Sequence, residues 1–382
     1  MKIALVHDQL REFGGAERVL VELKKIFPAA DIYTSSYQNS SLGAHSNLIK
    51  SWNVIISWFG KIPVINKLYS PLRFLTPLIW ENFDFSNYDL VISSTGSWMC
   101  KGIKTRPKGD RLMTEKYPLH ISYVHHPPRY LYGYETAVEW QKHWPIRIYG
   151  YIVNHFLRIW DFQASQRPDF FIANSEETRK RIQKFYRRDA IVIYPPVYIP
   201  DKLEVSSNNL RSNYYITVSR LARSKHVDIL IKAANKMKFN LKVIGTGRDE
   251  KVLKSLAGPT VEFLGNVSDV QLQKIYEGAK AFLFASVDEE FGIAPVEAMG
   301  YGLPVIAYKS GGLPETVIDG NNGYLYTDLT PDSLIEKIQL FEKLPKEKFA
   351  TMKKNARNQA EKFTDERFKK RIMDFVNSKI HK

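Results

Sequence analysis

Short apolar runs of strand length alternate with longer helix-forming segments along most of this chain. In the amino-terminal half these runs lie at Lys2–His7, Asp89–Ser93, His120–Val124, Asp169–Ala173 and Ile191–Tyr194. Runs that are apolar throughout are typical of parallel strands that helices cover on both faces. The alternation therefore predicts an α/β fold with parallel, helix-covered sheets.

A second alternation follows a stretch rich in proline, serine and asparagine, Pro195–Asn213, which we interpret as an interdomain linker. Its strand-like runs lie at 214–220, 241–247, 261–265, 281–286 and 304–310. A chain of 382 residues is long enough for two domains of ordinary size. We expect the domains at 1–200 and 201–363, followed by a segment with helical spacing at 364–382.

The net charge of +15 raises the question of a polyanionic partner. Both halves carry an excess of basic residues, with clusters at Lys101–Lys116, Arg179–Arg188 and Lys353–Lys382. Such clusters suit phosphate-rich partners, including anionic membrane surfaces, although each one by itself is typical of a solvated face. The chain has neither zinc-finger spacing nor an RNP signature, so we do not expect nucleic-acid binding.

Three features bear on the compartment. The single cysteine, Cys100, excludes an intramolecular disulfide and is consistent with a reducing compartment. The short apolar run at the amino terminus meets Asp8, unlike a signal peptide, and no run of 18 apolar residues is present. We expect a cytoplasmic protein.

The segment 51–80 combines Trp, Phe and Tyr with aliphatic side chains and with Lys61, Lys67 and Arg73 at intervals. Two interpretations remain open. Aromatic and cationic side chains beside an apolar surface suit a segment that lies on the inner face of a bilayer. The same composition suits a pair of helices packed inside the first domain.

The stretch Val287–Met299 places two carboxylates in one strand–loop–helix unit, Glu289 in the loop and Glu297 in the first helical turn, because Pro295 suits the first turn of a helix. At the carboxyl end of a parallel strand, a helix N-terminus presents free N–H groups to an anion. The amides of Gly292, Ile293 and Ala294 would serve this role, and each glutamate would accept hydrogen bonds from hydroxyls. Alternatively, Glu297 balances the helix dipole and Glu289 is a solvated loop charge.

Two cations and two glycine loops accompany this unit. Arg220 and Lys225 follow a strand, where they suit a diphosphate or are ordinary surface cations. The glycines at Gly245 and Gly247 lack the third glycine of a dinucleotide fingerprint, so we expect Gly245 to allow close approach of a backbone or a ligand. In the first domain, Gly14 and Gly15 separate a strand from a helix, where backbone amides approach phosphate or sugar.

The pair His125–His126 follows a strand and precedes two prolines. Neighbours in extended chain point to opposite sides, so at most one histidine faces a given cleft, and a purely structural role is the alternative. The sequence has no H-E-x-x-H, no cysteine cluster and no D-x-D, so we expect no metal site.

Together these residues resemble the retaining GT-B glycosyltransferases of family 4, often called group 1. The second half carries VSRLARSKHVDILIKA, VIGTGRDEKVLK and FASVDEEFGIAPVEAMGYGLPVIA, and the first half carries GGAERV, YDLVISS, YVHHPPRY and IANSEETRKRI. The resemblance implies two Rossmann-like domains with parallel sheets that face each other across a cleft. It also implies that 1–200 is the acceptor side, that 201–363 binds the nucleotide sugar, and that the helix at 364–382 packs back on the first domain.

The resemblance also implies roles for individual residues. Arg220 and Lys225 would hold the donor diphosphate, Glu297 the nucleotide ribose, and Val267 would lie in the base-binding loop. Glu289 and the backbone of Phe291, Gly292, Ile293 and Ala294 would bind the transferred sugar. His125 stands where the family pattern Y-x-H-x-P-x-R-Y has its active-site histidine, and His126 would be the variable neighbour.

One departure bears on the donor. The commonest form of the family loop is E-G-F-G, whereas Glu290 stands between Glu289 and Phe291 here. This form resembles a mannosyltransferase subgroup that uses GDP-mannose, with a UDP-sugar enzyme or a non-catalytic nucleotide-sugar-binding protein as alternatives. The resemblance implies a metal-independent, retaining hexosyltransferase without a cofactor besides its cosubstrate. The acceptor would be a glycan or a lipid-linked intermediate in surface polysaccharide or glycolipid synthesis, met at the inner membrane face.

Overall fold

The computed structural model describes residues 1–63, 69–105, 117–136, 140–200 and 213–380. Residues 201–212 of the predicted linker and 106–116 of one basic cluster lie outside the described residues. The chain divides into two compact units. The first comprises Met1–Tyr134, Trp140–Pro196 and Phe368–Lys382, and the second comprises Glu135–Glu139 and Val197–Arg367.

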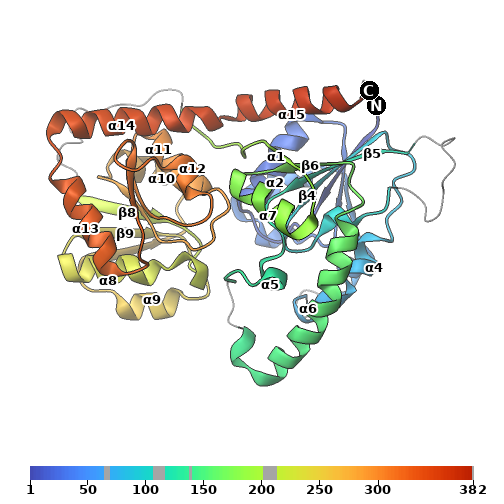
Figure 1. The fold of residues 1–382 in the computed structure, drawn as a ribbon, viewed down its shortest axis with the longest axis horizontal. Coiled ribbons are helices and arrows are strands. Elements are labelled where there is room, and N and C mark those ends of the chain that lie inside the picture. The colour runs from blue at the N-terminus through green and yellow to red at the C-terminus, as the bar shows by residue number, and fades with distance from the viewer. Residues whose placement is uncertain (64–68, 106–116, 137–139, 201–212, 381–382) are drawn as a thin grey trace. The chain divides into compact units, whose positions relative to one another are not determined.

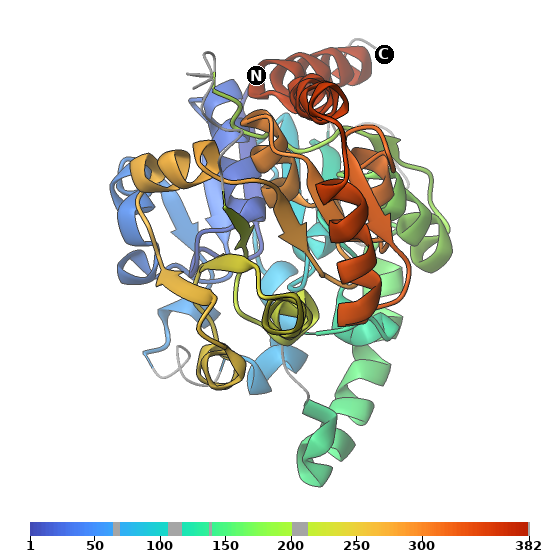
Figure 2. The same ribbon diagram turned by 90° about the vertical axis from the view of Figure 1, so that its left-hand side faces the viewer.

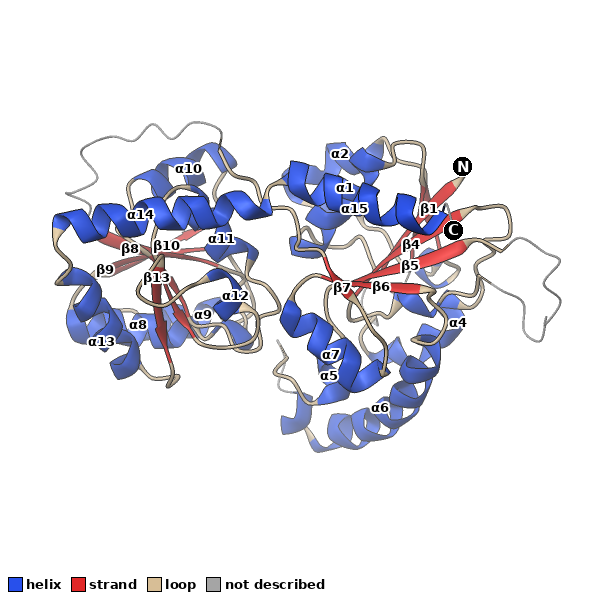
Figure 3. Ribbon diagram, turned by 45° about the horizontal axis from the view of Figure 1, so that its top comes forward, coloured by secondary structure: helices blue, strands red, loops and turns tan. Residues whose placement is uncertain are grey.

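The first unit is built on a seven-stranded parallel sheet with the order β3-β2-β1-β4-β5-β6-β7 (Figure 3). Its strands are β1 (Ile3–His7), β2 (Asp31–Thr34), β3 (Val54–Ile56), β4 (Leu90–Thr95), β5 (Leu119–Val124), β6 (Phe170–Ala173) and β7 (Ile191–Val192). Its helices are α1 (Gly15–Ile26), α2 (Ser46–Lys50), α4 (Thr76–Trp80), α5 (Arg129–Tyr132), α6 (Trp144–Ala164), α7 (Glu176–Tyr186) and the terminal α15 (Asp365–Ile380).

The second unit has a six-stranded parallel sheet with the order β10-β9-β8-β11-β12-β13 (Figures 1 and 2). Its strands are β8 (Tyr214–Val218), β9 (Asn240–Ile244), β10 (Val261–Gly265), β11 (Phe282–Phe284), β12 (Val305–Tyr308) and β13 (Gly323–Tyr326). Its helices are α8 (Val227–Met237), α9 (Glu250–Leu256), α10 (Asp269–Glu277), α11 (Ile293–Gly300), α12 (Leu313–Thr316), α13 (Pro331–Glu342) and α14 (Lys346–Ala360).

The strand order reverses once in each sheet. The chain starts at a central strand, moves to one edge, and then crosses back to build the other side, so the reversal lies between β1 and β4 in one sheet and between β8 and β11 in the other. This is the doubly wound arrangement, and it confirms the predicted α/β fold of two Rossmann-like domains. Loops that leave the carboxyl ends of the strands at a reversal run in opposite directions, which opens room for a ligand there.

In its described part, the segment 51–80 combines a strand with short helical turns, and residues 64–68, with Lys67, lie outside the described residues. Val54–Ile56 forms strand β3, which pairs with β2, and short 3₁₀ turns and α4 follow it in the described part of the segment. Phe59 and Trp80 are fully buried in the core of the first unit. Trp58 and Leu78, by contrast, are exposed. The aromatic side chains therefore divide between the core and the surface.

The terminal helix α15 joins the core of the first unit through one stripe. Phe368, Ile372 and Val376 recur every four residues and pack against the buried faces of β1, β4 and β5, and the ring of Phe368 lies 6.0 Å from that of Tyr123. Burial of each such side chain stabilises the unit by about 1.5–3 kcal/mol.

A carboxylate follows α4 and joins it to α6. Glu81 accepts hydrogen bonds from the indole of Trp160 at 2.9 Å and from Arg167, and it forms an ion pair with Lys104 at 2.6 Å. Burial alone would raise the pKa of Glu81, but these three partners outweigh it and lower the pKa to about 2. Ionised Glu81 therefore stabilises the fold.

The change Glu81→Gln tests this junction. Because the folded pKa lies below the unfolded value, the stabilisation is complete above about pH 4.5 and is lost as the pH falls toward 2. We expect the variant to lose about 1 kcal/mol of unfolding free energy at neutral pH, since the group is partly solvated. Urea unfolding at pH 7 and pH 3 measures the difference, which should shrink at the lower pH. An equal loss at both values would contradict the assignment, and Glu262→Gln, at an exposed position, is the control.

Candidate functional site

Three of the predicted donor residues of the second unit, Arg220, Lys225 and Glu289, lie in loops at the carboxyl ends of β8 and β11, where the strand order reverses. Arg220 and Lys225 belong to the loop between β8 and α8, and Glu289 belongs to the loop between β11 and α11. Parallel pairing of the two strands makes these loops neighbours. The site therefore occupies the edge where open α/β sheets bind ligands.

Lys225 and Glu289 contact each other directly. Lys225 Nζ lies 2.5 Å from Glu289 Oε2, and Ser286 Oγ lies 2.6 Å from the same carboxylate oxygen. Ser286 is fully buried, and its hydroxyl also lies 3.4 Å from Lys225 Nζ. The side chains of Lys225 and Glu289 keep 21% and 15% of their surface exposed, so both remain partly accessible to solvent. A cation for phosphate and an acceptor for hydroxyls thus stand side by side.

The loop that carries Glu289 rests on the glycines that follow β12. Gly312 donates its N–H to the carbonyl of Glu289 at 2.7 Å, and the Ser310 hydroxyl accepts from the N–H of Asp288 at 2.9 Å. Gly311 has a φ of +58°, and a Cβ there would lie 2.0 Å from the Glu289 carbonyl oxygen. Only glycine allows the two backbones to come so close.

Gly245 plays the same part for the loop that carries Arg220. Its φ is +117°, and a Cβ on it would lie 2.1 Å from the carbonyl oxygen of Ser219. The N–H of Leu221 donates to the carbonyl of Thr246 at 2.9 Å, which ties the β8 and β9 loops together. The close neighbour of Gly245 is therefore a backbone, one of the two options left open by the sequence. Arg220 itself is exposed.

Helix α11 begins directly behind Glu289. Gly292 caps it with a φ of +85°, so the amides of Ile293 and Ala294 occupy the first two helical positions, where N–H groups lack intrahelical partners. Phe291 is buried against the ring of Phe363 at 5.1 Å and anchors the loop. The predicted anion-facing amides thus lie at a true helix start.

Glu297 lies in the second turn of α11 rather than in the predicted first turn, because the helix already starts at Ile293; Pro295 lies in the first turn, as predicted. Its residue surface is 8% exposed. Burial, together with the nearby Glu297 carboxylate, raises the pKa of Tyr301 to about 12. Tyr301 therefore stays a neutral phenol near this carboxylate.

Val267 follows β10 and is half-buried, directly before Ser268, whose side chain caps α10. Its neighbour Asn266 accepts from the hydroxyl of Thr246 at 3.4 Å, so the β9 and β10 loops meet at this point. Val267 lies at the same carboxyl edge of the sheet as the two loops with Arg220 and Glu289.

In the first unit, His125 takes part in a buried polar chain. Its Nε2 lies 2.7 Å from Ser94 Oγ, Ser94 Oγ lies 3.1 Å from His7 Nδ1, and His7 Nε2 lies 3.3 Å from Glu17 Oε1. These residues come from the carboxyl ends of β1, β4 and β5 and from the first turn of α1. A hydrogen-bond chain of this kind fixes the orientation of the terminal imidazole.

The chain continues to the predicted glycine loop. Glu17 accepts from the N–H of Gly14 at 2.8 Å, so this amide is engaged inside the unit, whereas Gly15 is the first residue of α1. Beside it, the buried Asp8 carboxylate accepts from the backbone N–H groups of Gly96, Trp98 and Cys100 at 2.8–2.9 Å. His126 instead has its Nδ1 3.1 Å from the carbonyl of Pro127.

Sequence reasoning missed Ser286, Ser94, His7 and Glu17. Ser286 and Ser94 stand at the ends of strand-like runs, so the sequence could have placed them at the carboxyl edge of a sheet. It could not have predicted which residues they contact, because those residues follow or belong to other strands. His125, Gly14 and Gly15 lie in the first unit, and the remaining predicted site residues lie in the second.

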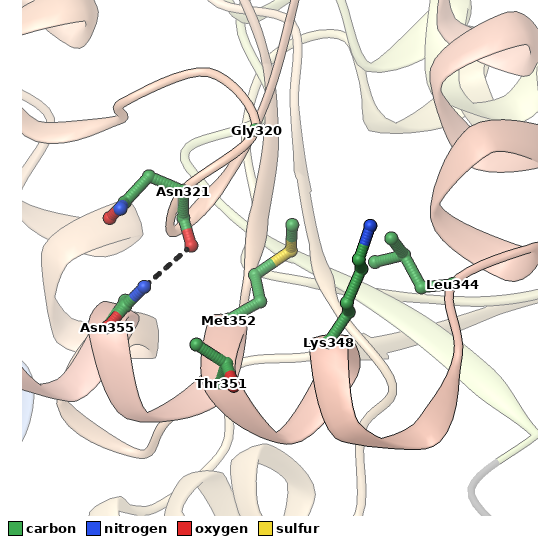
Figure 4. Close-up of a pocket in the computed structure, with 7 residues that line it drawn as sticks. All are labelled: Gly320, Asn321, Leu344, Lys348, Thr351, Met352 and Asn355. Atoms are coloured by element: carbon green, nitrogen blue, oxygen red, sulfur yellow. Dashed lines mark hydrogen bonds between the residues drawn. The ribbon is translucent and has the colours of Figure 1, made fainter.

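A pocket of about 340 Å³ lies elsewhere in the second unit (Figure 4). It is lined by α14 and by the turn before β13, where Asn355 donates to the carbonyl of Asn321 at 3.3 Å. That turn is at the amino end of its strand, opposite to the edge that carries Lys225 and Glu289. In the described part of the chain, no group of three His, Cys, Asp or Glu side chains is placed to hold a metal ion.

The geometry of the second unit agrees with a family match. Residues 199–359 match the glycosyl transferases group 1. The matched segment contains the loop between β8 and α8, the loop between β11 and α11, the whole of α11 and the turn Gly245–Gly247. The similarity in sequence therefore covers the loops that carry Arg220, Lys225 and Glu289 at the carboxyl edge of the sheet.

Curated relatives agree with this match at moderate identity. The chain is 30% identical over 178 residues to the UDP-N-acetylglucosamine–peptide N-acetylglucosaminyltransferase GtfA subunit of Streptococcus pneumoniae, covering 44% of this chain and 35% of that protein. It is 26% identical over 243 residues to the human alpha-1,3/1,6-mannosyltransferase ALG2, covering 54% and 58%. The chain thus spans less than two thirds of the length of either relative.

A solved structure matches over the whole length. The Anabaena protein HepE, crystallised with UDP-glucose, superposes with a TM-score of 0.69 at 21% identity, covering 99% of this chain and 100% of that one. The two-domain α/β fold class predicted from the sequence is therefore confirmed.

The change Gly311→Ala tests the support of Glu289. Gly320 has a similar φ of +73°, but a Cβ added there would have no heavy atom within 4 Å, so Gly320→Ala carries the backbone strain without the clash. We expect Gly311→Ala to lower the unfolding free energy by about 2 kcal/mol more than Gly320→Ala, as measured by chemical denaturation. Equal losses of unfolding free energy in the two variants would show that the loop carrying Glu289 moves away from the added methyl group at no cost.

Proposed function

We propose that this protein is a glycosyltransferase that moves a hexose from a nucleotide sugar to a hydroxyl acceptor. The arrangement that supports this most is the Lys225–Ser286–Glu289 cluster at the strand-order reversal, inside the segment that matches glycosyl transferases group 1. The ligand class follows from the chemistry of the cluster. A cation, a carboxylate and a helix N-terminus suit a diphosphate that is bonded to a polyhydroxylated ring.

Each group has a role in the proposed reaction. Arg220 and Lys225 stabilise the departing diphosphate together with the amides at the start of α11, which is preorganised electrostatic catalysis. Glu289 accepts hydrogen bonds from the sugar, and Glu297 from the ribose. His125, held by Ser94, orients the sugar or the acceptor.

The proposed mechanism retains the anomeric configuration and needs no metal. The acceptor hydroxyl attacks from the face that the diphosphate leaves, so the C–O bond to phosphate breaks as the new glycosidic C–O bond forms. The hydroxyl proton passes to the leaving phosphate oxygen. No protein nucleophile takes part.

We propose GDP-mannose as the donor. The support is Glu290 in the loop and the similarity to a mannosyltransferase. A UDP-sugar is the second candidate, because the structurally similar Anabaena protein binds UDP-glucose and the Streptococcus relative is named for UDP-N-acetylglucosamine. We propose a glycan or lipid-linked acceptor, met by the first domain at the cytoplasmic membrane face.

A panel of GDP- and UDP-sugars in thermal unfolding tests the donor. A ligand present at about 100 times its Kd stabilises the folded state by about 2.7 kcal/mol, which raises Tm. We expect GDP-mannose to raise Tm more than UDP-glucose or UDP-N-acetylglucosamine. A rise in Tm with UDP-sugars alone would mean that the donor is a UDP-sugar and not GDP-mannose. No rise in Tm with any nucleotide sugar would contradict the proposed function.

Variants from each unit test the chemistry. We expect His125→Ala and Glu289→Gln each to lower donor turnover, measured as released nucleoside diphosphate, by about 10²-fold while Tm stays near the wild-type value. His126→Ala and Glu262→Gln are the controls, one at the neighbouring histidine that contacts the Pro127 carbonyl and one at an exposed glutamate. Wild-type turnover in His125→Ala or Glu289→Gln would remove that residue from the site.

A further inference from the structure

Helix α6 has a large apolar surface that faces solvent. Figures 1 and 2 show its amino-terminal end extending beyond the sheet and helices of its own unit. Its exposed large apolar side chains are Trp144, Ile146, Ile148, Tyr149, Tyr151, Ile152, Phe156, Ile159 and Phe162. Trp144 and Phe156 keep 68% and 66% of their surface exposed. An exposed patch of this extent marks an interaction surface.

The helix is apolar on two opposite faces. Leu157 and Ala164, with the paired Asp161, belong to a buried stripe that packs on the unit. On the opposite side, Ile148, Ile152 and Ile159 recur at spacings of four and seven residues and form an outer stripe. A helix with apolar residues on all sides is normally buried, so the outer stripe of α6 lacks the cover that its composition requires.

The exposed charges on α6 are all positive. Its single acidic residue, Asp161, is fully buried and pairs with Lys101, while Arg147 and Arg158 are exposed. Lys142, just before the helix, is exposed as well. The outer surface of α6 therefore combines aromatic and aliphatic side chains with cations and carries no exposed carboxylate.

Neighbouring elements extend this surface. The hydroxyl of Tyr149 donates to the carbonyl of Pro71, and Trp160 contacts Glu81, so the 3₁₀ turn Pro71–Leu75 and α4 lie beside α6. These neighbours carry exposed Phe74 and Leu78. Part of the aromatic segment 51–80 thus borders the outer stripe of α6.

We propose that the outer face of α6, with the adjoining Phe74 and Leu78, docks on an anionic lipid bilayer. A helix with an apolar face, interfacial Trp and Tyr, and basic residues lies flat in the headgroup region. Every helix among the described residues is too short or too polar to span a bilayer. A second copy of this chain fits the face less well, because it would bring exposed Arg147 and Arg158 against cations of the same sign.

Docking through α6 goes beyond the transfer reaction and needs no donor. It also selects among acceptors, although this step rests on the proposed function: a protein held at the headgroups meets a lipid-linked glycan more readily than a soluble one. Vesicle binding and donor binding can therefore be measured separately. A failure of one does not entail a failure of the other.

Vesicle co-sedimentation of the full chain tests docking, with phosphatidylcholine vesicles that either contain or lack phosphatidylglycerol. We expect binding that requires phosphatidylglycerol and falls at high salt. The double change Ile148→Ser with Ile152→Ser should lower the partition coefficient at least about tenfold, because it removes apolar surface. The matched control is Val252→Ser with Val270→Ser, at exposed positions on α9 and α10, which should bind like the wild type.

A charge variant and two further measurements complete the test. Removing the cations with Lys142→Gln and Arg147→Gln should weaken binding about fivefold per charge. Tm and its response to GDP-mannose should be unchanged in every variant, which separates docking from donor binding. Docking on α6 is overturned if wild type ignores phosphatidylglycerol or if the Ile148/Ile152 variant binds like wild type. It is equally overturned if light scattering shows a wild-type dimer that the variant abolishes without any lipid binding.

Discussion

Parallel pairing of β8 with β11 brings two loops together that lie far apart in the sequence. Ile216 of β8 stands opposite Phe282 of β11, and at the carboxyl ends of these strands Lys225 meets Glu289 across a separation of 64 residues. The strand order of the sheet reverses between β8 and β11, so the loops that follow these two strands run in opposite directions and leave room between them. A cation and a carboxylate therefore share one open position that no local segment could build.

Backbone contacts without side chains between them hold these loops. Gly245 lies against Ser219, and Gly311 lies against Glu289, each at a distance that a Cβ would prevent. The first contact supports the loop of Arg220, and the second supports the carboxylate proposed to bind the sugar. The glycines therefore act indirectly: they fix the positions of the two loops, and the loops carry the side chains of Arg220 and Glu289.

The first unit also brings side chains from the carboxyl ends of adjacent strands together, and here they form buried hydrogen bonds. His125, Ser94 and His7 stand at the carboxyl ends of three adjacent strands, so their side chains reach one another, and Glu17 closes the chain from the start of α1. The same unit presents the outer stripe of α6 at its surface. The proposed acceptor side thus holds a fixed polar centre and an apolar surface, which suits a partner that is both polar and lipidic.

The sequence by itself determined the fold class and most of the strands, because apolar runs at regular intervals have few ways to be buried other than in helix-covered parallel sheets. It also marked Glu289, Lys225 and His125 through their places just past strand ends. It missed β2, β3 and β13. The strand β3 lies in the aromatic segment 51–80, whose composition also suited helices or a bilayer surface, and the four residues of β2 or β13 suit a turn as well as a strand. Only the tertiary structure decided that Ser286 holds the Lys225–Glu289 pair, that His125 is one end of a buried chain, and that the outer face of α6 is uncovered. Partners and exposure depend on residues distant in sequence, which periodicity along one segment cannot report.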